Sequence, residues 1–283
     1  MEEFKRVFGI KFIMVFTVTV LLNIGLFVYS SSEGKSMSDI RQETHYRQWI
    51  IGELSDMQPE EALEIADIQS DSVIKRKYDE LESEEQTVYS RQLNKIKEQL
   101  EYIIKYPEDI KNIQNNADTL KSFSIFADKN SFTYNNIQKT AKDFKRVEGV
   151  QLYLTDNKAV SGFVTYYYIY YLALILNVFV LYELFGEREN GMWCIVHTSK
   201  SGRAKLAFNR TMIITASAFI ITGVLFFTTF LTSFILYKTA SINAPIQNIE
   251  SFSRFSLPMS QLQYIIYDFL YSFCAVLTLT AIV

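Results

Sequence analysis

A charged segment, residues 183–210, lies between two long apolar stretches of the sequence. It reads ELFGERENGMWCIVHTSKSGRAKLAFNR, whereas the stretches 160–182 before it and 211–237 after it are overwhelmingly apolar. A bilayer core about 30 Å thick needs roughly 20 apolar helical residues to cross it. Both stretches meet this requirement, so the sequence predicts a polytopic membrane protein.

Two further apolar stretches bring the number of predicted transmembrane helices to four. They cover residues 12–29, which carry no charge, and residues 262–283, where Asp268 is the one charged residue. A carboxylate at membrane depth is a functional candidate, although Asp268 lies only about 9 Å from Leu262 along a helix and can reach the outer interface. The sequence ends inside the fourth stretch without a polar or basic stop, so we expect the natural chain to continue.

Basic residues in short loops stay in the cytoplasm and therefore set the orientation. Such residues precede the first span (Lys5, Arg6 and Lys11) and lie within the 183–210 segment (Arg188, Lys200, Arg203, Lys205 and Arg210). The two groups share one side if spans one and two separate them. We therefore expect residues 1–11 and 183–210 in the cytoplasm, residues 30–159 and 238–261 outside, and the chain in the plasma membrane. The first apolar run is longer than a usual signal peptide core and has no clear cleavage site, so we expect it to be retained.

The segment between the first two spans is polar and acidic. Residues 30–158 hold most of the chain's 31 Asp and Glu residues, and the acids outnumber the bases there. This charge argues against nucleic-acid binding, which needs a basic face. An apolar stripe with helical spacing of 4, 3, 4 and 3 residues runs through it (Tyr89, Leu93, Ile96, Leu100 and Ile103). The pattern predicts an intrachain helical hairpin, with an intermolecular coiled coil as the alternative.

Prolines and apolar alternation give the expected boundaries inside this segment. Pro59 and Pro107 predict helices near residues 37–56, 60–82 and 84–106. The alternation of Val150, Leu152 and Leu154 predicts a short strand or an extended link before span two. The expected fold class is therefore an all-α polytopic membrane protein with four transmembrane helices and a mainly helical extracytoplasmic domain between the first two.

Motifs for catalysis and cofactor binding are missing from the sequence. It has no phosphate-binding G-x-x-x-x-G-K-[ST] loop, no G-x-S-x-G, no H-E-x-x-H and no C-x-x-C. Cys194 and His197 have a spacing that two metal ligands can use, but a zinc site needs three or four. We therefore expect no enzyme activity, no cofactor and no metal site. The tyrosines at 166–168, 170 and 171 are typical of an aromatic belt at the outer interface, with a substrate-stacking groove as the alternative.

The 183–210 segment resembles the ABC-2 type transporter permeases of Gram-positive bacteria. The residues that carry the resemblance are Glu187, Gly191, Thr198, Gly202-Arg203, Lys205-Leu206 and Arg210. Two further stretches look like the same subfamily: Ser124–Phe144, followed by Gly149-Val150, and Asn243–Phe252. The resemblance covers most of the chain after residue 120, whereas residues 30–115 match in topology alone.

The resemblance implies a permease that dimerises, binds a separate ATPase and exports a substrate. Because the chain has no phosphate-binding loop, the 183–210 segment is expected to dock on the ATPase as a coupling loop. Its candidate residues are Glu187, Gly191, Trp193, Thr198, Gly202, Arg203 and Lys205. One alternative is a four-span permease of the mechanotransmission type, and another is a membrane receptor or anchor with a helical ectodomain.

Overall fold

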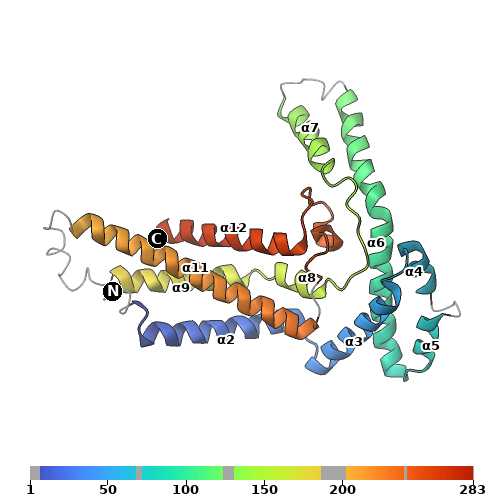
Figure 1. Ribbon diagram of the computed structural model, residues 1–283, viewed down its shortest axis with the longest axis horizontal. Coiled ribbons are helices and arrows are strands. Elements are labelled where there is room, and N and C mark those ends of the chain that lie inside the picture. The colour runs from blue at the N-terminus through green and yellow to red at the C-terminus, as the bar shows by residue number, and fades with distance from the viewer. Residues whose placement is uncertain (1–6, 68–71, 124–130, 186–201, 239–240, 283) are drawn as a thin grey trace. The chain divides into compact units, whose positions relative to one another are not determined.

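The computed structural model describes residues 7–67, 72–123, 131–185, 202–238 and 241–282. Every regular element in these ranges is a helix, and four of the helices are long and apolar enough to cross a membrane (Figure 1). The chain is an all-α polytopic membrane protein, as the sequence predicted. Its described residues divide into a membrane unit (within 1–34, 162–235 and 265–283) and a helical domain (within 35–161 and 236–264).

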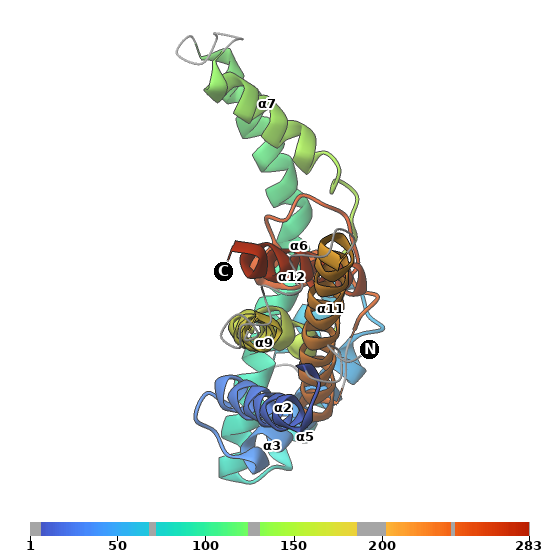
Figure 2. The same ribbon diagram turned by 90° about the vertical axis from the view of Figure 1, so that its left-hand side faces the viewer.

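The membrane unit contains the four apolar helices that match the predicted spans. These are α2 (Ile10–Ser32), α9 (Tyr168–Phe185), α11 (Gly202–Tyr237) and α12 (Gln261–Ile282). They run side by side in Figure 1 and are seen nearly end on in Figure 2. Aromatic side chains join neighbouring helices: the ring of Phe219 on α11 lies 5.6 Å from Phe269 and 5.5 Å from Phe273 on α12.

The second apolar stretch is interrupted near its start. We expected one helix over residues 160–182, but α8 (Lys158–Val164) ends and α9 begins only at Tyr168. Backbone hydrogen bonds between residues three positions apart span the break. The amide of Tyr166 donates to the Phe163 carbonyl at 3.2 Å. α9 then spans 18 residues, about 27 Å, which is close to the thickness of the hydrocarbon core.

The helical domain is built around α6 (Ser83–Ser122). The five residues of the predicted stripe are all at most 5% exposed, and they form one apolar cluster with residues of α3 (Met37–Leu54). α3 begins with a capping box in which Ser36 and Asp39 bond each other's backbone amides. These hydrogen bonds hold the pKa of the Asp39 carboxyl below its usual range. The stripe therefore packs within the chain.

The expected helix end at Pro107 is wrong. α6 continues through this proline for another four turns to Ser122. Proline has no amide hydrogen, so Ile103 loses its helical hydrogen bond, at a cost of about 3 kcal/mol. The apolar stripe offsets this cost because it extends past the proline to Ile110 and Ala117, both buried. α7 (Phe132–Phe144) packs against this helix, as Figure 1 shows.

The expected single helix over residues 60–82 is also wrong. The structure has two short helices, α4 (Pro59–Ile65) and α5 (Val73–Asp79), which both pack on α6. Ser72 starts the second one, because its hydroxyl accepts a hydrogen bond from the Lys75 amide at 3.3 Å. A serine cap of this kind favours a new helix start over helix continuation.

Residues 150–157 form an extended link and no β-strand, so the second of our two expectations for this stretch is correct. The link is held by segment 241–261, which includes the single-turn helices η3 (Ile246–Asn248) and η4 (Glu250–Phe252). The side-chain amide of Asn248 donates to the Tyr153 carbonyl at 2.7 Å, and that of Gln261 donates to the Asn157 side chain at 2.7 Å. The two segments that lie between membrane helices in the sequence thus fold into one domain.

Candidate functional site

The two ends of the charged 183–210 loop meet inside the membrane unit. Arg210 on α11 is only 6% exposed, and its guanidinium carbon lies 5.3 Å from the ring centroid of Phe185, the last residue of α9. Arginine over an aromatic ring is a favourable cation–π arrangement, worth about 2 kcal/mol when desolvated. This contact ties α9 to α11 and closes the base of the loop.

The structure places some of the expected loop residues and leaves others undescribed. Glu187, Gly191, Trp193 and Thr198 lie outside the described residues. Gly202 and Arg203 open α11, and Lys205 lies exposed in its first turn.

α11 continues from the loop into the membrane without a break. It has 36 residues, about 54 Å at 1.5 Å per residue, whereas the hydrocarbon core needs about 30 Å. We expected this span to begin at residue 211, but the helix starts nine residues earlier, at Gly202. The first turn of α11, next to the loop, and its apolar membrane segment thus belong to one continuous helix.

A buried polar cluster joins three parts of the membrane unit around Asn23. The Asn23 side-chain amide donates to the Thr229 hydroxyl on α11 at 2.8 Å. The Tyr166 hydroxyl, from the break before α9, donates to the Asn23 backbone carbonyl at 3.1 Å and lies 3.2 Å from its side-chain oxygen. Polar bonds between helices in a bilayer are worth about 0.6 kcal/mol on average. The cluster fixes α2 against α11 and explains the orientation of Tyr166.

Asp268 on α12 is half-buried and bonded to α9. The Tyr170 hydroxyl lies 3.1 Å and 3.2 Å from the two carboxylate oxygens of Asp268. The ring of Phe226 lies 6.4 Å from that of Tyr170, and the ring of Phe269 lies 5.6 Å from that of Phe226, measured between ring centroids. A carboxylate in such surroundings can hold a proton or a cation.

The tyrosine group divides into two sets. Tyr167, Tyr168 and Tyr171 are exposed, as an aromatic belt requires. Tyr166 and Tyr170 instead make the internal hydrogen bonds to Asn23 and Asp268. The belt interpretation therefore applies to part of the group only.

Sequence reasoning missed two amide side chains that connect the membrane helices. Asn23 and Asn177 are the only amide side chains in α2 and α9, and this isolation is a signal that sequence alone provides. The Asn177 oxygen lies 3.4 Å from the Ser217 hydroxyl on α11. The contact of Arg210 with Phe185 had no such signal. The rule that basic residues in short loops stay in the cytoplasm already explained a basic residue at position 210.

Three comparisons with known proteins give no match. No protein-family model, no curated protein and no solved structure is significantly similar to this chain. The functional argument therefore depends on the residues and their geometry.

Proposed function

We propose that this chain is the membrane-spanning permease subunit of an ABC transporter, an exporter of the ABC-2 type. A separate ATPase docks on the 183–210 loop and supplies the work. The observation that carries the proposal is the closed base of this loop, where Arg210 on α11 covers the Phe185 ring at the end of α9. A partner that pulls on the loop thus acts on two membrane helices at once.

The proposed orientation places this loop in the cytoplasm and the helical domain outside the plasma membrane. It rests on the basic residues before α2 and at the start of α11. The partners are the ATPase, the lipid bilayer and a second permease copy. Large apolar side chains on α12, such as Ile266 and Leu270, are about half exposed and are available to lipid or to that second copy.

Cysteine labelling tests this orientation. In a background with both native cysteines replaced by serine, cysteines at Phe132 and Asn243 should react with a membrane-impermeant maleimide in intact cells. Both positions are exposed in the helical domain. A cysteine at the exposed Lys205 should react only after the cells are opened. Labelling of Lys205→Cys in intact cells would contradict the proposed orientation and place the 183–210 loop outside the cell.

Loop substitutions test the docking role. We expect Glu187→Ala and Gly191→Val to reduce co-purification of the ATPase at least tenfold, because they alter the proposed docking surface and leave every apolar span intact. Membrane insertion should be unchanged, as measured by the amount of protein in the membrane fraction. Arg203→Ala should reduce co-purification less than these two variants do, if Arg203 binds lipid headgroups and not the ATPase. Unchanged ATPase recovery in both loop variants contradicts the docking role.

A four-span mechanotransmission permease is the second candidate, and one observation favours it. The last residues of α11, Leu236 and Tyr237, belong to the helical domain. There the Gln48 side-chain amide donates to the Tyr237 carbonyl at 2.9 Å. The same helix thus connects the coupling loop to the domain outside the membrane. ATP-driven change in the helical domain without movement of a solute would select this candidate over the exporter.

A further inference from the structure

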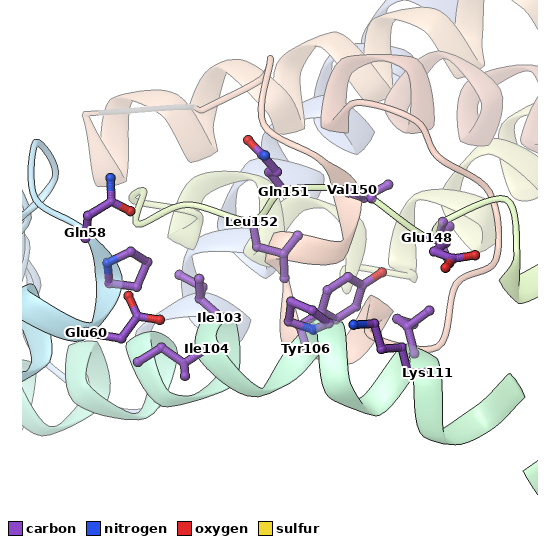
Figure 3. Close-up of a pocket in the computed structure, with 15 residues that line it drawn as sticks. Gln58, Glu60, Ile103, Ile104, Tyr106, Lys111, Glu148, Val150, Gln151 and Leu152 are labelled. Atoms are coloured by element: carbon purple, nitrogen blue, oxygen red, sulfur yellow. The ribbon is translucent and has the colours of Figure 1, made fainter. Parts of the chain in front are cut away.

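The helical domain contains a cavity of about 540 Å³ that no step of the proposed function uses. It lies between α6, the start of α4 and the segment 147–152, and Figure 3 shows it in close-up. Gly149, with a φ of 89°, turns the chain into the segment that forms one wall. The volume falls in the range of small-ligand sites, about 300–1,000 Å³.

The side chains on the floor of the cavity are apolar except for one hydroxyl group. Ile103, Ile110, Val147 and Leu152 are buried there. Tyr106 is only 2% exposed, and its hydroxyl has no hydrogen-bond partner among the described residues. In Figure 3 its ring extends from α6 toward the opposite wall at Val150. Burial raises the pKa of Tyr106 to about 12, so the hydroxyl keeps its proton at neutral pH and can donate it in a hydrogen bond.

A backbone acceptor accompanies this donor. Pro107 lines the cavity and has no amide hydrogen, so the Ile103 carbonyl lacks its helical partner. Ile103 and Tyr106 are three residues apart and therefore lie on one face of α6, with their Cβ atoms about 5–6 Å apart. The floor thus offers one donor and one acceptor between apolar side chains.

The charged residues at this cavity lie at its exposed rim. Glu60 and Glu148 contribute two carboxylates, and Lys111 contributes one ammonium group. The rim therefore carries a net negative charge and disfavours an acidic ligand.

We propose that this cavity binds a short peptide segment with apolar side chains and no acidic residues. A peptide group presents one acceptor and one donor, which complement the Tyr106 hydroxyl and the Ile103 carbonyl. Its apolar side chains cover the isoleucine floor. A simple hydrocarbon chain leaves both polar groups unpaired in a dry site, and that costs about 1–3 kcal/mol for each group. This inference goes beyond the proposed function and does not depend on ATPase docking.

Binding to the full-length chain in lipid nanodiscs tests the proposal. The probes are N-acetylated, C-amidated tripeptides of Leu, Val and Phe, measured by equilibrium dialysis. We expect saturable binding, at least fivefold weaker binding when the peptide amides are N-methylated, and weaker binding when the outer residues are glutamates. Absence of saturable binding, or equal affinity for the N-methylated peptides, overturns the proposal.

Two tyrosines one helical turn apart provide a matched pair of variants. Tyr106→Phe should weaken binding about fivefold without lowering the melting temperature, because it removes a hydroxyl that has no protein partner. Tyr102→Phe should leave binding unchanged and lower the melting temperature by about 2–4 °C, because the Tyr102 hydroxyl donates to the Gln247 carbonyl at 2.7 Å. Equal peptide affinity of Tyr106→Phe and the unaltered chain overturns the proposal. ATPase co-purification is measured on the same samples. A loss of peptide binding with unchanged ATPase recovery then concerns this cavity alone and not the docking role of the 183–210 loop.

Discussion

An Asp156→Ala variant is expected to lose about 3–5 kcal/mol of helical-domain stability, because it leaves a buried charge unpaired. The Asp156 carboxylate lies 2.9 Å from Nε of Arg47, and the two side chains are 6% and 12% exposed. It also accepts a hydrogen bond from the Lys158 amide at 3.2 Å. The Arg47 guanidinium lies 5.8 Å from the Tyr237 ring centroid, so the ion pair also borders the end of α11.

Urea unfolding of the full-length chain measures this loss. Trp49 packs against the domain core, and a Trp193→Phe background makes it the only tryptophan that reports unfolding. The control is Glu101→Ala, which removes an ion pair with Lys105 whose side chains are 53% and 66% exposed. Exposed pairs of this kind contribute about 0–1 kcal/mol. If Asp156→Ala lowers the free energy of unfolding no more than Glu101→Ala does, the Asp156–Arg47 ion pair does not stabilise the domain.

A Leu100→Ala variant is expected to destabilise the same domain by about 2–5 kcal/mol. Leu100 is completely buried in the middle of α6, in the cluster shared with α3. Removal of its side chain leaves a cavity that the surrounding helices fill only in part. Val73→Ala, at a position 48% exposed, is the control and should change stability by no more than about 0.5 kcal/mol.

The concentration dependence of the Leu100→Ala experiment separates the two interpretations of the stripe. Intrachain packing predicts the same loss at every protein concentration. An intermolecular coiled coil predicts a loss that depends on protein concentration, because association then contributes to stability. A loss below about 0.5 kcal/mol would place Leu100 on the surface.

Local patterns were sufficient to predict the spans and the apolar face of α6. Residues 12–29 and 262–282 lie within α2 and α12, because length and hydropathy alone determine such helices. Leu93 and Leu100 are buried because their helical spacing keeps them on one side of α6.

Local rules failed where tertiary contacts outweigh them. Proline normally ends a helix, but α6 continues past Pro107 because buried side chains and α7 lie beyond it. The break at Tyr166 depends on Asn23, a residue 143 positions away. The hydrogen bonds of Asn248 to Tyr153 and of Gln261 to Asn157 are equally non-local, because they join residues 95 and 104 positions apart.

The candidate site could be predicted in part. Charge and length located the 183–210 loop, and the charge in an apolar run identified Asp268. The partners of these residues, Phe185 for Arg210 and Tyr170 for Asp268, come from other helices and have no sequence signal.

Cross-linking in living cells tests the central claim, that a separate ATPase drives this chain through its 183–210 loop. A photoreactive amino acid replaces Trp193 in the loop, and in a second strain it replaces Phe132, which is 84% exposed in the helical domain. We predict that irradiation joins the Trp193 variant to a protein with a phosphate-binding loop, identified by mass spectrometry, and that the Phe132 variant gives no such product. Absence of an ATPase from the Trp193 products, or its capture by the Phe132 variant, would contradict the account.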